Sequence, residues 1–192
     1  MELADKSAWR RRVRELLHAL PAEARAAASR HLREVLLAQP IWSHASRVLC
    51  FAPLDEEPDI TSVMDDAWQA GKAVALPRYD SGSRRYEAAR ITALSQLVRG
   101  QFGVLEPGPG CPATPLNQLD LVLVPGVAFD LTGRRLGRGK GFYDRLLAEV
   151  RGHKCGVCFD AQVVPEVPEE PHDVRLDSIL TPTRWHLCRV ES

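Results

Sequence analysis

The chain has 192 residues, of which 45% are hydrophobic and 26% charged, and its 25 basic residues balance 25 acidic ones. This length predicts a single domain spanning residues 1–192, large enough to bury a substantial core. Zero net charge argues against a general nucleic-acid binder, which usually carries a basic excess, so any basic site must be local. No apolar run approaches the roughly 18–20 residues of a membrane-spanning helix. We expect a cytoplasmic monomer without nucleic-acid or membrane partners.

Five cysteines are scattered along the chain, and this odd number argues against a disulfide framework. Cys155 and Cys158 form a C-x-x-C motif, but they lie inside an apolar run and not at a strand-to-helix turn. A zinc site would need two further ligands, and the sequence has no second C-x-x-C motif. We therefore interpret the pair as small side chains of the core.

Two helices are expected at the start of the chain. Residues 5–20 repeat apolar side chains at helical spacing, and Lys6, Arg10 and Arg14 form a separate basic ridge at intervals of four residues. Pro21 begins a second, alanine-rich helix that ends near residues 39–40. A basic ridge is usually a solvated face, so it indicates no function by itself.

Strands and helices then alternate along the chain. A strand at 47–51 leads into an acidic turn at 54–59, a helix at 60–70 and a strand at 72–76 that Pro77 closes. Residues 80–83 are expected to form a turn and residues 86–91 an edge strand. Residues 102–110, which are rich in proline and glycine, are expected to be irregular. This order is typical of a parallel α/β sheet.

The stretch from 119 to 150 predicts a strand, a glycine-rich basic loop and a helix. The apolar run at 119–124 is typical of a buried parallel strand. The helix places Tyr143, Leu147 and Val150 on one face, and such an arrangement points backbone N–H groups and a helix N-terminus at an anion. Strands near 154–159 and 176–180 follow, with a proline-rich loop at 163–171 between them. The chain therefore predicts an α/β fold, a single-domain three-layer sandwich with a mainly parallel sheet.

The loop at 133–145 carries the clearest chemical signal. Its basic side chains are Arg134, Arg135, Arg138, Lys140 and Arg145. Glycines 137, 139 and 141 let backbone N–H groups approach a ligand, which together with the basic groups suits a triphosphate. Asp144 is close enough to reach a metal that bridges such phosphates. The glycine spacing fits neither a Walker A loop nor a Rossmann fingerprint, so these residues alone leave open a phosphate site and a solvated turn.

Ligands of α/β folds bind beyond the carboxyl ends of the strands. This rule brings together the turn at 54–59, the loop after Pro77, the loop at 127–141 and the loop at 160–173. The mixture of acidic and basic side chains in these loops indicates a polyanionic substrate together with a metal.

The sequence LVLVPGVAFDLTGRRLGRGKGFYDRLL resembles the signature of the 5-formyltetrahydrofolate cyclo-ligase family, also called 5,10-methenyltetrahydrofolate synthetases. The match over residues 120–144 is long and specific. Supporting motifs occur in the family's order: K-x-x-x-R at positions 6–10, E-P-D at 57–59, L-P-R at 76–78, an F-G-containing motif at 102–107 and H-D at 172–173. The resemblance covers nearly the whole chain. One departure is Phe142, where the family commonly has tyrosine.

The resemblance implies an ATP- and Mg²⁺-dependent ligase of folate-dependent one-carbon metabolism. Its reaction would convert 5-formyltetrahydrofolate to 5,10-methenyltetrahydrofolate and release ADP and phosphate. The formyl oxygen would be phosphorylated first, and N10 would then close the ring. The resemblance also implies a fold similar to the sugar-phosphate isomerase/CoA-transferase superfamily.

The resemblance further implies site residues, position by position. ATP would be bound by Lys6, Arg10, Arg135, Leu136, Gly137, Arg138, Gly139, Lys140, Gly141, Phe142 and Tyr143. The catalytic residues facing the formyl group would be Arg138, Lys140 and Phe142. The folate would be bound by Leu54, Glu57, Asp59, Arg138 and Phe142, and Mg²⁺ would be held by Asp144 and Asp173. Glu106 and His172 receive no role.

Three other interpretations stay open. A nucleic-acid-binding module would rest on Arg10–Arg14 and the basic loop, but it would call for clustered aromatic side chains, and aromatics make up 6% of this chain. An isomerase or CoA-transferase-type enzyme of the same fold would need neither ATP nor the ridge at Lys6 and Arg10. A family member that binds ATP without turnover is the third, and Phe142 alone does not support it.

Overall fold

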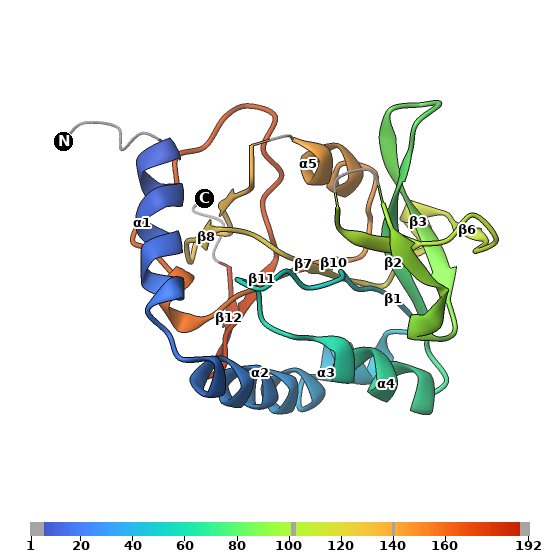
Figure 1. Cartoon of the computed structure of the whole chain (residues 1–192), viewed down its shortest axis with the longest axis horizontal. Helices are drawn as coiled ribbons and strands as arrows, with labels where there is room; N and C mark the ends of the chain where they lie inside the picture. Colours follow the sequence, from blue (N-terminus) through green and yellow to red (C-terminus); the bar gives the residue numbers. More distant parts are fainter. Residues whose placement is uncertain (1–5, 101–102, 140, 189–192) are drawn as a thin grey trace.

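The computed structural model describes residues 6–100, 103–139 and 141–188, and these fold into helices packed on both faces of a central sheet (Figure 1). The helices are α1 (Lys6–His18), α2 (Ala22–Leu37), α3 (Pro40–His44), α4 (Thr61–Gln69) and α5 (Phe142–Leu147). The longer strands are β1 (Arg47–Leu49), β2 (Ala73–Asp80), β3 (Arg85–Ile91), β7 (Leu121–Val124), β10 (His153–Val157), β11 (Ser178–Leu180) and β12 (Trp185–Leu187). The shorter ones are β4 (Leu97–Arg99), β5 (Leu105–Pro107), β6 (Ala113–Thr114), β8 (Ala128–Phe129) and β9 (Arg135–Leu136).

The central sheet has eight strands in the order β12-β11-β10-β7-β1-β2-β3-β6. Its middle, from β11 to β2, is parallel, whereas β12, β3 and β6 pair antiparallel at its two sides. Two separate pairs, β4–β5 and β8–β9, form small hairpins beside it. The predicted α/β architecture with a mainly parallel sheet is therefore confirmed.

Alternate residues of the central strands point to opposite faces of the sheet, as the pleat requires. Leu121 and Leu123 of β7 pack in one apolar cluster with helices α2, α3 and α4. Val122 and Val124 pack on the other face, in a cluster with Leu146 and Leu147 of α5. These two apolar layers explain why β7 is buried along its whole length.

Helix α1 packs beside the sheet in a third apolar cluster (Figure 1). Its buried Val13 and Leu17 contact the cluster that contains Ala128 of β8 and Leu136 of β9. Burying such a side chain contributes about 1.5–3 kcal/mol. This packing holds the basic ridge of α1 next to the loop that follows β9.

Several predicted boundaries differ from the structure. Strand β2 does not end at Pro77 but continues to Asp80, because its partner β1 stops opposite Ala75 and the missing N–H of proline therefore interrupts no bond to β1. The predicted edge strand, β3, is partly covered by β6 at Ala88 and Ala89. Helix α5 ends before Val150, although that side chain is buried. Strand β5 lies inside the stretch expected to be irregular, and β12 was not predicted.

Cys155 and Cys158 are buried free thiols, which confirms their interpretation as core side chains. Among the residues that the structure describes, no helix combines the length and apolar composition needed to cross a membrane.

Candidate active site

A cavity of about 620 Å³ opens at the carboxyl ends of β1 and β7. The chain leaves β1 through α4 to β2 on one side, and it leaves β7 through α5 to β10 on the other. Adjacent β1 and β7 therefore mark the point where the connections diverge, which is where ligands bind in α/β folds. Phe51 and Ala52 line the cavity after β1, and Pro125 and Gly126 line it after β7.

The cavity collects nearly all of the site residues expected from the sequence. Those that line it are Lys6, Arg10, Leu54, Glu57, Arg135, Leu136, Gly137, Arg138, Gly139, Gly141, Phe142, Tyr143, Asp144 and Asp173. Lys140 lies outside the described residues. Asp59 is not brought to the cavity: its exposed carboxylate accepts a hydrogen bond of 2.9 Å from the Thr61 N–H at the start of α4. Of the two turn carboxylates expected to bind the folate, Glu57 is the one that lines the cavity.

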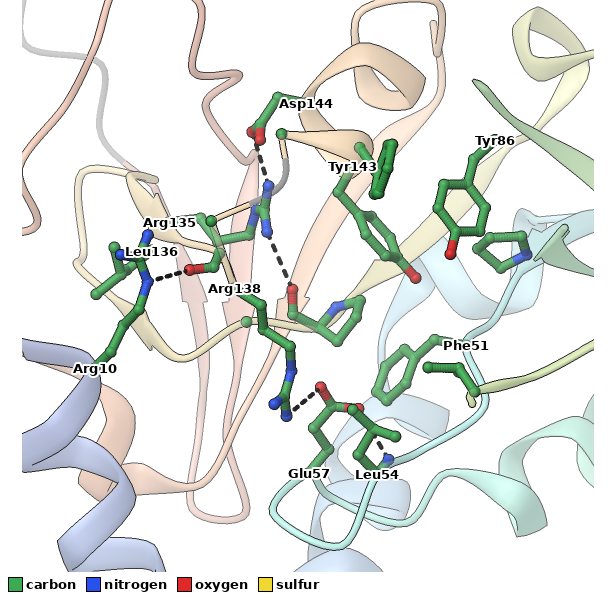
Figure 2. Close-up of a pocket in the computed structure, with 18 of the residues that line it drawn as sticks. Arg10, Phe51, Leu54, Glu57, Tyr86, Arg135, Leu136, Arg138, Tyr143 and Asp144 are labelled. Atoms are coloured by element: carbon green, nitrogen blue, oxygen red, sulfur yellow. Dashed lines mark hydrogen bonds and ion pairs between the residues drawn. The ribbon is translucent and has the colours of Figure 1, made fainter. Parts of the chain in front are cut away.

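One wall of the cavity combines α1 with the glycine-rich loop. Arg10 Nε donates a hydrogen bond of 2.9 Å to the Gly137 carbonyl, as Figure 2 shows. Gly139 has a φ of 95°, a conformation that favours glycine, and a Cβ placed there would lie 3.5 Å from the Arg10 guanidinium. Lys6 Nζ lies 3.2 Å from Asp173 Oδ2 and 3.3 Å from a Glu170 oxygen. Arg10 and Gly137 are 127 residues apart in the sequence, and their contact joins the ridge and the loop into one basic wall.

Arg135 lies beneath this loop with only 4% of its side chain exposed. Its Nη2 is 2.7 Å from Asp144 Oδ1 and its Nη1 donates to the Pro125 carbonyl at 3.5 Å (Figure 2). Within the described residues its Nε has no hydrogen-bond partner. A Cβ at Gly137 would come within 2.8 Å of Arg135 Nη1, so a larger residue there would require the guanidinium to shift. Asp144, expected to hold a metal, is therefore already in a buried ion pair.

Glu57 occupies the end of the cavity next to Leu54. Its side chain is only 6% exposed, and its two oxygens accept hydrogen bonds from the Leu54 N–H at 3.0 Å and from Arg138 Nη2 at 3.2 Å. Burial raises the pKa of Glu57, and the Leu54 N–H and the Arg138 charge oppose that shift in part. A desolvated carboxylate therefore lies beside a cation of the glycine-rich loop.

Aromatic side chains form the opposite wall. The rings of Tyr79, Tyr86 and Phe142 pack edge to face, with centroids 5.3–5.6 Å apart. Tyr86 and Phe142 line the cavity, and Tyr143, whose pKa is raised by burial, lines it beside them. Glu106 also lines this side, where a carboxylate oxygen accepts a hydrogen bond of 3.1 Å from the Tyr79 N–H.

Tyr86 and Glu106 are the polar residues of this wall to which the sequence interpretation gave no role. Tyr86 reaches the cavity because the β2–β3 register pairs it with Tyr79. Nothing in the local sequence pattern marks that pairing. The E-P dipeptide at Glu106 was a visible signal, but it did not separate a ligand contact from a turn.

The acidic groups of the cavity suit a hard cation. Ligand atoms of Glu170, His172 and Asp173 lie within 4.8 Å of one another, and all three residues line the cavity together with Asp144. Mg²⁺ prefers oxygen ligands and is usually held by one or two carboxylates together with substrate phosphates. The carboxylates of Asp144 and Asp173 fit this requirement, since they stand beside the basic wall. Helix α5, with six residues, adds at most a weak dipole, so an anion would rest mainly on side chains and the loop.

Comparison with known proteins decides the family. The model of the 5-formyltetrahydrofolate cyclo-ligase family matches residues 2–182. The chain belongs to the 5-formyltetrahydrofolate cyclo-ligase family. Membership confirms the resemblance seen in the sequence and makes this cyclo-ligase family member an enzyme of the ligase class.

Individual relatives agree with this assignment. The 5-formyltetrahydrofolate cyclo-ligase of Mus musculus is 30% identical over 187 residues, covering 91% of this chain and 92% of the relative. The enzyme of the same name from Mycolicibacterium smegmatis is 37% identical over 152 residues, covering 73% and 76%. The solved structure of Aquifex aeolicus 5,10-methenyltetrahydrofolate synthetase superposes with a TM-score of 0.86 at 32% identity, covering 97% and 94% of the two chains.

Proposed function

We propose that this enzyme uses ATP and Mg²⁺ to convert 5-formyltetrahydrofolate into 5,10-methenyltetrahydrofolate, releasing ADP and phosphate. The observation that carries the proposal is the position of Arg138. It belongs to the glycine-rich loop that Arg10 contacts, and its guanidinium reaches Glu57 at the other end of the cavity. One side chain therefore joins a wall suited to phosphates to a carboxylate suited to the pterin.

The basic wall would bind the triphosphate of ATP. Lys6 and Arg10 approach from α1, and Arg135 and Arg138 approach from the loop. Guanidinium groups bind phosphate oxygens in forked geometry, and the ammonium of Lys6 adds a point charge. The loop glycines leave room for the phosphates against the backbone.

The other end of the cavity would bind the folate. The amine and amide edge of a pterin offers N–H donors, which the carboxylate of Glu57 can accept. Leu54 and Phe51 line the cavity next to it and supply apolar surface for the ring. Arg138 reaches Glu57 from the glycine-rich loop and Phe142 lines the same cavity, and the formyl group would face these two residues.

The reaction needs an activated formyl oxygen, because the carbon of a formamide is a poor electrophile. The formyl oxygen attacks the γ-phosphorus, and the bond from that phosphorus to ADP breaks. N10 then attacks the formyl carbon, the carbon–oxygen bond breaks as phosphate leaves, and the N10 proton is released. Phosphoryl transfer depends chiefly on placement and charge neutralisation, which the arginines of this cavity supply.

Asp144 and Asp173 would hold Mg²⁺ in this enzyme. The ion neutralises charge on the phosphates of ATP when it is bound. Both carboxylates are engaged by cations in the structure, Asp144 by Arg135 and Asp173 by Lys6.

The proposal is tested by mixing the protein with 5-formyltetrahydrofolate, ATP and Mg²⁺ and following the absorbance of the methenyl product together with ADP. We expect both products, and we expect neither when ATP is omitted or Mg²⁺ is chelated. A folded preparation that forms neither product would contradict the proposal. A substrate-dependent activity that survives removal of ATP would favour the isomerase or CoA-transferase alternative.

Arg10→Ala provides a sharper test of the phosphate wall. Losing a hydrogen bond to a charged group costs about 1.5–3 kcal/mol, so kcat/KM for ATP should fall about 10- to 150-fold. Arg11→Ala removes the same charge from an exposed position of the same helix and should leave kcat/KM nearly unchanged. Equal effects of the two substitutions would exclude a direct role for Arg10.

A further inference from the structure

The wall of the cavity that faces away from Arg10 is largely apolar (Figure 2). Phe51, Pro77 and Phe142 line it, and Phe142 carries no hydroxyl. Ligand cavities are mostly apolar, and the few polar groups among the apolar ones fix the orientation of the ligand. The polar groups on this wall therefore decide how a substrate lies against it.

Tyr86 places a hydroxyl on this wall. Its ring is held by edge-to-face packing against Tyr79 at 5.5 Å and Phe142 at 5.3 Å, and the β2–β3 register fixes its backbone opposite Tyr79. Figure 2 shows the hydroxyl directed into the cavity, on the side where Tyr143 and Phe51 also point. The side chain is half-buried, so the hydroxyl can be reached by a ligand.

The Tyr86 hydroxyl has no hydrogen-bond partner within the described parts of the chain. The hydroxyl is therefore available to donate a hydrogen bond to an acceptor atom of a ligand in the cavity. Burial and the nearby Glu106 carboxylate both raise the pKa of Tyr86, so the phenol keeps its proton and can donate it. Glu106 itself is held by the Tyr79 N–H at 3.1 Å.

We propose that the Tyr86 hydroxyl donates a hydrogen bond to a carbonyl oxygen of the reduced-folate substrate and thereby orients that substrate beside Phe142. The inference rests on the proposed function, because it takes the folate to occupy the end of the cavity formed by Glu57 and the aromatic wall. It makes Tyr86 a determinant of folate recognition that has no part in ATP binding, since Arg10, which contacts the glycine-rich loop, stands on the other wall.

The test is Tyr86→Phe, which removes one oxygen and keeps the ring that packs on Tyr79 and Phe142. Titration calorimetry measures binding of 5-formyltetrahydrofolate and of ATP separately, each in the absence of the other, so turnover is not needed. We expect the Kd for the folate to rise about 3- to 10-fold, as for one neutral hydrogen bond, and the Kd for ATP to stay within about twofold. The thermal midpoint should stay close to that of the wild type.

Steady-state kinetics gives a second comparison of how Tyr86→Phe affects folate binding and ATP binding. The KM for the folate should rise and the KM for ATP should not. An unchanged folate Kd in Tyr86→Phe, or an equal rise for folate and ATP, would overturn the inference. Failure of the proposed function would give a different result. A wild type that binds the folate without turnover would contradict that function, but the ratio of the folate Kd of Tyr86→Phe to that of the wild type would still test the Tyr86 contact. A wild type that binds no folate overturns both.

Discussion

The substitution Glu57→Gln is expected to weaken folate binding without lowering the stability of the fold. The carboxylate is buried, and its two described contacts are the Leu54 N–H at 3.0 Å and Arg138 Nη2 at 3.2 Å. Glutamine has nearly the same shape and can still accept a hydrogen bond through its single amide oxygen. Its NH₂ group, however, would face the N–H donors of a pterin. We therefore expect folate binding to suffer while the fold persists.

The size of the effect follows from the contact that is lost. A buried donor left without an acceptor costs about 1–3 kcal/mol, which corresponds to a folate Kd about 5- to 150-fold higher. The free energy of unfolding at neutral pH should rise or stay unchanged in Glu57→Gln. Because burial raises the pKa of Glu57 above its ordinary 4.5, the native state holds this proton more tightly than the unfolded chain. The stability from this group is present below pH 4.5 and is lost as pH rises through the raised pKa, so a neutral glutamine removes a cost that exists at neutral pH.

The assay compares KM for folate, KM for ATP and the thermal midpoint in wild type, Glu57→Gln and Glu56→Gln. The Glu56 carboxylate lies 3.6 Å from the same Arg138 but does not line the main cavity, so its substitution controls for lost charge around that arginine. We also expect wild-type folate affinity to fall as acid protonates Glu57, at a pH above 4.5, and this step to be absent in Glu57→Gln. A folate KM within twofold of wild type, or a loss of activity that only follows a lower thermal midpoint, would refute the reasoning.

Three further predictions concern stability and reactivity. Asp144→Ala should lower the free energy of unfolding by about 3–5 kcal/mol in denaturant titrations, because it leaves buried Arg135 without its charged partner; a change below 1 kcal/mol would contradict a buried pair. Burial lowers the pKa of His153, so the stability it contributes is present above pH 6.5 and is lost as pH falls through the lowered value. His153→Gln should flatten that part of the stability curve, and an unchanged curve would argue against it. Burial raises the pKa of Cys155 to about 12 and that of Cys158 well above its usual value, so a thiol reagent at neutral pH should modify neither before unfolding, whereas rapid native labelling would show that they are accessible.

The fold could be predicted where its signals are local. The apolar run of β7 and the periodicity of α1 gave the right elements, since burial on both faces and helical spacing leave direct traces in the sequence. Pro77 misled the prediction because its effect depends on the length of β1, which is distant in the chain. Strand β12 was missed for the same reason: it is defined by pairing with β11 and not by a strong pattern of its own.

The site could be predicted only in part from spacing. The glycines and basic residues of the loop are contiguous, so an anion site was one of two interpretations. Lys6 meets Asp173 across 167 residues and Arg138 meets Glu57 across 81, and no local rule brings such partners together. The family resemblance named these residues without pairing them, and in the structure all four line one cavity. The roles of the individual side chains in binding stay predictions.

Asp130 shows what spacing rules cannot reveal. Its carboxylate is fully buried, and it accepts hydrogen bonds from the N–H groups of Thr132 at 2.9 Å, Arg134 at 3.2 Å and Val167 at 2.9 Å. The first two bonds shape the turn between β8 and β9, and the third ties that turn to the segment that continues to Asp173. One aspartate thus ties the turn that precedes the glycine-rich loop to the segment that carries Glu170 and Asp173.

Basic and acidic side chains are paired inside the cavity. Lys6 is paired with Asp173, Arg135 with Asp144, and Arg138 with Glu57. Of the three cations only Arg135 is buried, and its pair with Asp144 leaves no buried charge uncompensated. A ligand that brings both phosphates and a divalent cation can take over both halves of the Lys6–Asp173 and Arg135–Asp144 pairs, because the phosphates would bind the cations while the metal would bind the carboxylates. A bare anion would free carboxylates that then have no partner. The charge arrangement of the cavity therefore favours a metal–nucleotide complex over either component alone, which is the form of ATP that the proposed reaction requires.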